Sequence, residues 1–197
     1  YNTNGFYSPL RLFSVDQSKE YRKKLESTES KIGPLHYFAK TYTMMKWVYD
    51  VATNNTMLDF VEDLIGKNIL LYNATFIIKE PKSKTHVSWH QDLTYWQLDN
   101  DEEVTCWFAV SEASKEAGCM KFVPQSHKNK ILPHNDTYAA NNLLSRGQEI
   151  AVKVDDNKAV YAALKAGEAS FHHGLIFHSS GPNGTPDRRI GSAIRYI

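Results

Sequence analysis

The 197-residue sequence predicts a mainly β fold, a β-sandwich or jelly roll, with helices packed on one side. Two observations predict this class. The first third of the chain has the apolar spacing of helices, and from Ile69 onward short β-prone runs are separated by turn residues. No helix-length segments alternate with these runs, which disfavours a parallel α/β fold.

The helical part is expected from about residue 14 to residue 66. Ser14 followed by Gln17 has the spacing of a capping box, which predicts a helix start. A second helix is expected after Pro34, with apolar positions at Leu35, Phe38, Met45, Val48 and Ala52. A third is expected over residues 58–65, because Gly66 is a natural C-terminal stop.

Seven or eight strands are expected over about residues 69–197. The β-rich runs are ILLYNATFIIK, THVSWHQDLTY, VTCWFAVSEA, GCMKFVPQ, EIAVKV, EASFHHGLIFHSS and RRIGSAIRYI. Between the first two, KEPKSKTH is charged and is predicted to be a solvated hairpin. At 22.5 kDa the chain is long enough for one core and short for two, so a single domain over residues 1–197 is expected.

Composition excludes several kinds of partner. Lys and Arg number 23 against 22 Asp and Glu, so no overall charge favours nucleic acid or an anionic membrane. No apolar run reaches the length of a membrane span, and no signal segment is seen. Cys106 and Cys119 lack CxxC spacing, which predicts a reduced, intracellular (cytoplasmic) protein. The sequence starts at Tyr1 rather than Met, which is compatible with a segment upstream.

A metal site is suggested by VSWHQD at residues 87–92. Residues two apart on a strand share a face, so His90 and Asp92 could both reach one cation. His134 and Asp136 in LPHNDTY have the same spacing, but Pro and Asn surround them and no alternation is present. For either pair taken alone, a structural role is as good an interpretation as metal ligation.

The C-terminal 31 residues supply what a facial non-haem Fe(II) site would still need. Such a site takes a second histidine and leaves positions open for a co-substrate and oxygen. The candidate histidines are His172, His173 and His178. A Gly-Pro-Asn-Gly turn and then Arg188, Arg189 and Arg195 follow them. A dicarboxylate that chelates iron needs a cation at its far end, and a guanidinium binds carboxylate best.

These motifs resemble the phytanoyl-CoA dioxygenase family of Fe(II)- and 2-oxoglutarate-dependent oxygenases, which includes ectoine hydroxylase. The resemblance runs from GFYSPLRLFS to the C-terminus. Its most specific parts are VSWHQD, WFAVSEASKEAGCMKFVPQSHK, HHGLIFHSSGPN and RRIGSAIRYI. It implies a double-stranded β-helix (jelly roll) core.

The resemblance also implies roles for individual residues. The implied iron ligands are His90, Asp92 and His178. Arg189, eleven residues after His178, matches the arginine that binds the distal carboxylate of 2-oxoglutarate, and Ser180 matches a hydroxyl beside it. The strand of Thr105 and Trp107 is implied to line that pocket. Because strand residues alternate, only one of Arg188 and Arg189 should point inward, and we choose Arg189.

The implied activity is oxidation of a C–H bond in a small organic metabolite, using 2-oxoglutarate and O2 and releasing succinate and CO2. Related halogenases keep a small residue at the position of Asp92, so a carboxylate there favours hydroxylation. Substrate contacts are predicted for Gln91, Tyr95 and Trp96, and pairing with an acidic neighbour for Arg195. Two alternatives remain open: a non-catalytic jelly-roll protein that keeps the metal pocket for a ligand, and a zinc hydrolase. Substrate identity and oligomeric state are not predicted.

Overall fold

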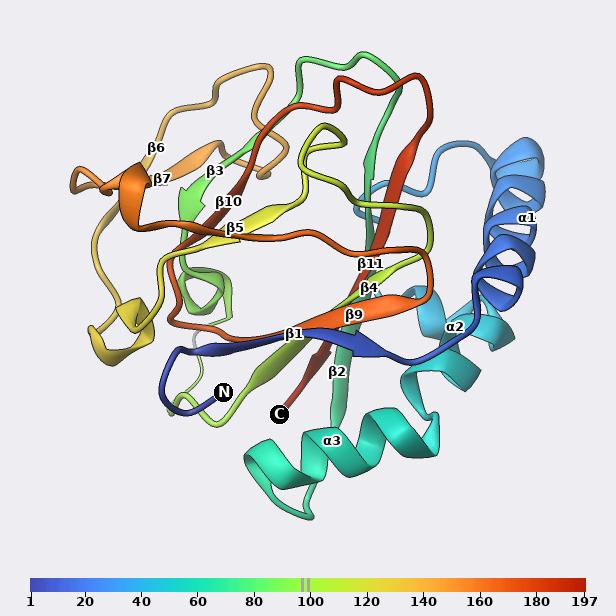
Figure 1. Ribbon diagram of the computed structural model, residues 1–197, viewed down its shortest axis with the longest axis horizontal. Helices are drawn as coiled ribbons and strands as arrows, with labels where there is room; N and C mark the ends of the chain where they lie inside the picture. The colour runs from blue at the N-terminus through green and yellow to red at the C-terminus, as the bar shows by residue number, and fades with distance from the viewer. Residues whose placement is uncertain (97, 99) are drawn as a thin grey trace.

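The computed structural model describes residues 1–96, 98 and 100–197, and it contains two main antiparallel sheets with helices on one side (Figure 1). The larger sheet has the order β1 (Phe6–Arg11), β9 (Glu168–His173), β4 (Val104–Ala109), β11 (Arg189–Tyr196) and β2 (Leu71–Lys79). The smaller has the order β3 (Val87–His90), β10 (His178–Ser180), β5 (Met120–Phe122) and β8 (Val160–Ala162). A two-stranded sheet pairs β6 (His134–Asp136) with β7 (Gln148–Ile150). The predicted fold class is confirmed.

The helices α1 (Val15–Ile32), α2 (Lys46–Ala52) and α3 (Asn55–Ile65) pack beside the larger sheet (Figure 1). Short 3-10 turns are η1 (Thr41–Thr43), η2 (Asp92–Tyr95), η3 (Ser126–Lys128) and η4 (Asp156–Lys158). The capping box at Ser14 is confirmed, because Ser14 and Gln17 each accept a hydrogen bond from the other's backbone N–H. Gly66 ends α3 with φ of 88°, a conformation that favours glycine.

The segment after Pro34 is a correction. It is helical only at η1 and over α2, and Phe38 is 47% exposed rather than on a buried face. The reason is pairing with β2: the Tyr37 N–H donates to the Phe76 carbonyl and the Ile78 N–H donates to His36 Nδ1. A backbone held by sheet partners cannot also form a helix.

The strand β1 was not predicted, and it contains a proline within FYSPLR. It lies at the edge of the larger sheet and, among the described residues, pairs with β9 alone. Proline lacks an N–H donor and is tolerated on an edge strand, where one side of the ladder has no partner. The larger sheet therefore begins with the N-terminal residues.

The larger sheet buries a different core on each face. On one face, side chains such as Phe76 and Phe108 pack against the helices. On the other, their chain neighbours Ile77 and Trp107 face the smaller sheet. This alternation is the two-residue period of a strand. No helix in the described part of the chain is both long and apolar enough to cross a membrane.

The register of β11 positions the site. Arg189 lies opposite Lys79 of β2, and Ala193 lies opposite Thr75 of β2 and Trp107 of β4. Arg195 lies opposite Asn73 and Thr105. All of these residues except Lys79 line one cavity between the two sheets. One strand therefore carries two arginines, six residues apart, on its cavity face.

Candidate functional site

The three predicted metal ligands come together where β3 ends and β10 begins, in the smaller sheet. One nitrogen of His90, one nitrogen of His178 and one carboxylate oxygen of Asp92 all lie within 4.8 Å of one another, and all three side chains are buried. Pairing of β3 with β10 sets His90 directly opposite His178. The strand ends at His90, and Asp92 opens the turn η2 rather than continuing the strand face. The turn still directs its carboxylate toward the two imidazoles, at 3.4 and 3.6 Å from their Nε2 atoms.

Both histidines are oriented as metal ligands by backbone carbonyls. His90 Nδ1 lies 2.9 Å from the Ser88 carbonyl, and His178 Nδ1 lies 3.0 Å from the Ile176 carbonyl. A carbonyl accepts only, so each Nδ1 carries the proton and donates, which leaves each Nε2 lone pair facing the site. Burial, together with the neighbouring His90, holds the pKa of His178 well below its usual value. His178 is therefore in the neutral form that binds a metal.

The second carboxylate oxygen of Asp92, Oδ2, lies against residues in and next to the larger sheet. Thr105 Oγ1 lies 3.2 Å from Asp92 Oδ2 and 2.8 Å from Glu103 Oε1, and His172 Nε2 lies 3.6 Å from Asp92 Oδ2. Burial alone would raise the pKa of Asp92, but the imidazole of His172 holds it well below its usual value. Burial and the charge of Asp92 raise the pKa of Glu103 well above its usual value. A protonated Glu103 can donate to Thr105, whose own proton then goes to Asp92.

The cavity has a volume of about 330 Å³. Its lining contains the three ligands and most of the other predicted site residues: Thr105, Trp107, Ser180, Arg189, Tyr95 and Trp96. Gln91 is not among them. Its side-chain oxygen accepts from the Leu132 N–H at 2.8 Å and its amide donates to the Leu175 carbonyl at 2.9 Å, so it braces two loops beneath the site. The predicted substrate contact of Gln91 is not supported by this position.

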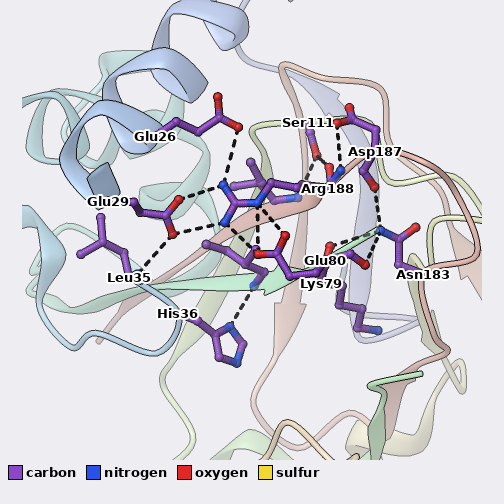
Figure 2. Close-up of polar contacts among 12 residues, drawn as sticks. Glu26, Glu29, Leu35, His36, Lys79, Glu80, Ser111, Asn183, Asp187 and Arg188 are labelled. Atoms are coloured by element: carbon purple, nitrogen blue, oxygen red, sulfur yellow. Dashed lines mark hydrogen bonds and ion pairs between the residues drawn. The ribbon is translucent and has the colours of Figure 1, made fainter. Parts of the chain in front are cut away.

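The two adjacent arginines point in opposite directions. Arg188 lies on the outside, where its guanidinium binds Glu29 at 2.8 Å and Glu80 at 2.9 Å, as Figure 2 shows. Arg189 is 1% exposed and lines the cavity, with its guanidinium carbon 5.1 Å from the centre of the Trp107 ring. Its Nε and one Nη have no hydrogen-bond partner among the described residues. Burial lowers the pKa of Arg189 to about 10, so it stays charged at neutral pH.

Lys79 lies beside Arg189 and was not predicted as a site residue. It is fully buried, and its side-chain nitrogen donates to Ser180 Oγ at 2.6 Å, to the Ser180 carbonyl at 3.3 Å and to the Gly181 carbonyl. Figure 2 shows Lys79 below Arg188 and its glutamate partners. Because Ser180 Oγ accepts from the Lys79 nitrogen, the Ser180 hydroxyl proton is free to point into the cavity. The first residue of KEPKSKTH is thus part of the site, whereas Glu80, Pro81, Lys82 and Lys84 are exposed as predicted.

The second His-x-Asp pair has a structural role. His134 Nε2 accepts a hydrogen bond from the Gln91 N–H at 3.1 Å, and His134 Nδ1 donates to the Leu132 carbonyl at 2.8 Å. Asp136 pairs with Arg146 at 3.1 Å. Both ring nitrogens of His134 are therefore occupied, and this pair supports the segment that carries the first one.

The cavity fits a metal ion and a dicarboxylate. Two imidazoles and one carboxylate on one side of an open space are the donor set of a facial non-haem iron site. At the end of the same space next to Lys79, the guanidinium of Arg189 has unused donors and no carboxylate within 4.0 Å among residues 1–96, 98 and 100–197. A buried cation without a counter-charge is unfavourable, so this position is suited to an anion.

Comparisons with known proteins agree with this geometry. A family model described as phytanoyl-CoA dioxygenase matches residues 3–191. The probable alpha-ketoglutarate-dependent hypophosphite dioxygenase of Stutzerimonas stutzeri is 30% identical over 148 residues, which is 74% of this chain and 51% of that protein. The peroxisomal phytanoyl-CoA dioxygenase of Homo sapiens is 30% identical over 148 residues, which is 71% of this chain and 43% of that protein. The chain therefore spans about half the length of these curated relatives.

A solved structure is similar over nearly the whole chain. The apo form of the non-heme monooxygenase ThoJ matches with a TM-score of 0.86 at 29% identity, covering 99% of this chain and 74% of that one. The predicted resemblance, the double-stranded β-helix fold and the HxD…H triad are thus all confirmed together. The chain belongs to the phytanoyl-CoA dioxygenase family of 2-oxoglutarate-dependent non-haem iron oxygenases.

Proposed function

We propose that this protein is an Fe(II)- and 2-oxoglutarate-dependent dioxygenase that hydroxylates, or otherwise oxidises, a C–H bond of a small organic metabolite, releasing succinate and CO2. One observation carries the proposal. A single cavity holds both a three-ligand cluster and a buried guanidinium that has no carboxylate partner among the described residues. The name of the Stutzerimonas relative includes alpha-ketoglutarate dependence, which supports the same co-substrate here.

The two alternatives explain less of the cavity. A zinc hydrolase would use the ligands but would leave Arg189 buried without an anion, and an uncompensated buried charge costs several kcal/mol. A binding protein that has lost its chemistry would have no need for both imidazoles to keep their Nε2 atoms directed at one point. The oxygenase uses all of these features.

Each residue contributes a defined action. His90, His178 and Asp92 would hold the metal, and Thr105 orients the Asp92 carboxylate through its hydrogen bond. Bound Fe(II) with 2-oxoglutarate would supply the activation of O2 and the oxidation of the C–H bond.

The other residues that line the cavity would bind the co-substrate and position the substrate. Arg189 and the Ser180 hydroxyl would bind the distal carboxylate of the co-substrate, while the Trp107 ring covers the guanidinium and excludes water from it. Tyr95 and Trp96 would form the wall against which the substrate is positioned. Positioning and exclusion of water are the contributions of the protein to this chemistry.

Anaerobic spectroscopy tests the proposal directly. Fe(II) and 2-oxoglutarate added to the protein without oxygen should give the weak visible charge-transfer absorption of the chelate. His178→Ala and Asp92→Ala should lose it. Absence of the absorption from the folded wild-type protein, when a related oxygenase shows it in the same buffer, would refute the proposal.

The adjacent arginines offer a matched pair of variants. Arg189→Gln should raise the Kd for 2-oxoglutarate at least tenfold, about 1.4 kcal/mol or more, because a charge-assisted bidentate contact is lost. Arg188→Gln removes an arginine that binds Glu29 and Glu80 on the outside, so it should leave that Kd within about twofold. Equal effects of the two substitutions would contradict the assignment of Arg189.

A further inference from the structure

A second guanidinium lines the same cavity. Arg195 shares the cavity face of β11 with Arg189, and their separation of six positions corresponds to roughly 20 Å of strand. The residues opposite Arg195 and Arg189 in the sheet show which parts of the cavity the two arginines line. Thr105, opposite Arg195, binds Asp92, whereas Lys79, opposite Arg189, binds Ser180. Asp92 therefore lies toward Arg195, and the predicted co-substrate anchor lies at the other end.

The arginines of this chain fall into two groups. The sequence has six, and four of them make ion pairs on the outside: Arg11, Arg22, Arg146 and Arg188. The other two are Arg189 and Arg195, and neither has a carboxylate within 4.0 Å among residues 1–96, 98 and 100–197. The predicted pairing of Arg195 with an acidic neighbour is not seen in this part of the chain. Both exceptions lie in one cavity.

The Arg195 head group is held in place with donors unused. One Nη donates to Thr75 Oγ1 at 2.9 Å and to the Ala193 carbonyl at 3.3 Å, and the Trp96 ring lies 5.4 Å from the guanidinium carbon. The buried Nε has no partner among the described residues. An arginine fixed by one nitrogen and stacked on an aromatic ring presents its remaining N–H groups in a defined direction, as carboxylate and phosphate recognition requires.

An uncharged hydrogen-bond donor, the side-chain amide of Asn73, lies next to Arg195. Asn73, opposite Arg195 in the register, also lines the cavity, and its side-chain oxygen accepts from the Lys40 N–H at 2.8 Å. That bond identifies the oxygen and turns the amide NH2 group toward the other side, where a ligand oxygen could accept from it. A guanidinium and an amide NH2 side by side are suited to an oxyanion.

The formal charges of the loaded cavity lead to the same class of ligand. Arg189, Arg195 and Asp92 sum to +1, a divalent metal adds two, and the 2-oxoglutarate dianion removes two. One positive charge remains, and it belongs to the Arg195 end. A neutral substrate would leave this charge, at the partly buried Arg195, without a counter-charge from the ligand, whereas an anion would balance it.

We propose that Arg195, with Asn73, binds an oxyanion group of the substrate, so that the compound oxidised by this protein is a small organic anion, a carboxylate or a phosphate or phosphonate ester. This assignment rests on the function proposed above, because it takes the Arg189 end to be filled by 2-oxoglutarate. It makes Arg195 a specificity-determining residue. The C–H bond that reacts then lies between that oxyanion and the metal.

Matched acids and amides test the charge preference without turnover. The protein is loaded with Ni(II) and N-oxalylglycine, an unreactive analogue of 2-oxoglutarate, so that the triad and Arg189 are filled. Phenylacetate, hexanoate and ethylphosphonate are then titrated by calorimetry beside their neutral counterparts phenylacetamide, hexanamide and diethyl ethylphosphonate. At least one anion should bind at least tenfold more tightly than its neutral counterpart.

Three variants separate charge recognition from a structural role. Arg195→Gln should bring the anion-to-neutral ratio close to one while the Kd for the neutral compound changes less than about twofold, and Arg195→Lys should keep part of the preference. Arg11→Gln, which removes an outside arginine paired with Glu168, should keep all of it. A purely structural Arg195 would instead weaken both members of a pair together.

Two results would overturn the assignment of Arg195: no anion preferred over its counterpart by the loaded wild-type protein, or a preference that persists in Arg195→Gln. The loading step is measured first. Wild-type protein that fails to bind Ni(II) and N-oxalylglycine would refute the proposed function and this inference with it, whereas normal loading without an anion preference would refute the inference alone.

Discussion

Substituting the buried Lys79 with Met should make the metal-free protein more stable, and the gain should depend on pH. Lys79 lies beside Arg189 with no carboxylate partner among the described residues, and burial together with that neighbouring charge lowers the pKa of Lys79 from 10.5 to about 6. The unfolded chain therefore binds a proton that the folded chain releases between these two values. Methionine has a similar shape and no charge, so the variant loses this proton linkage.

The sign and size of the pH-dependent stability difference follow from the folded-state and unfolded-state pKa values of Lys79. Because the folded-state pKa is lowered, the unfolded state binds more protons, and the stability of the wild-type protein rises with pH by about 1.4 kcal/mol per unit between pH 6 and 10.5. From about pH 7 to pH 9 the advantage of Lys79→Met should shrink by roughly 2.7 kcal/mol. Hydrogen bonds lost at Ser180 and Gly181, about 1 kcal/mol each, offset the gain by a constant amount and leave the slope unchanged.

Urea unfolding of chelator-treated wild-type and variant protein at about pH 7, 8 and 9 measures this difference, and other titrating groups cancel from it. Lys84→Met, at an exposed lysine in the segment that follows β2, is the control for loss of a surface lysine and should leave stability nearly unchanged. Parallel stability profiles for wild type and Lys79→Met would refute the account of Lys79. The variant should also bind 2-oxoglutarate more weakly, because the Ser180 hydroxyl is no longer oriented by a hydrogen bond from the Lys79 nitrogen.

Three further substitutions test other parts of the structure. Gly191→Ala would place a Cβ 1.9 Å from the Trp107 ring, so we expect a loss of about 1–3 kcal/mol in urea unfolding; a loss below about 0.5 kcal/mol would contradict the tight contact. Ser14→Ala removes the capping box with Gln17 and should lower stability by about 1 kcal/mol, with a lower Tm as the readout. Glu103→Gln should be neutral below about pH 4.5 and increasingly stabilising as the pH rises toward 7, because burial raises the pKa of Glu103 and its ionisation opposes folding; an unchanged difference in urea midpoints across this range would argue against a protonated Glu103.

The ligand residues could be predicted because their signals are local. His90 and Asp92 are two residues apart in a β-prone run, and His178 and Arg189 are eleven residues apart on consecutive strands. Alternation along a strand also separates Arg189 from Arg188. The same rule places Gln91 on the face opposite His90, which is where the structure has it, so its predicted substrate contact conflicted with a rule that was already available.

The supporting residues could not be predicted, since their burial depends on pairing between distant strands. Lys79 begins the charged segment KEPKSKTH, and Glu103 ends the acidic segment DNDEE, so each has the composition of a solvated turn. Lys79 is buried because it pairs in register with Arg189, 110 residues later, and Glu103 because it lies beside Thr105 beneath the site. For the same reason β1, with its proline, could be recognised only from its partner β9.

The overall charge of the chain also conceals the charge of its cavity. A net charge of +1 suggests no preference among ligands, yet the acidic partners of Arg11, Arg22, Arg146 and Arg188 all lie on the outside. The net charge counts arginines that face the cavity and arginines that face solvent equally. The alternation and register of β11 are needed to tell which arginines face the cavity. Because an interior charge is screened far less than a surface charge, the two inward guanidiniums should dominate what the cavity binds, even though they are a third of the arginines.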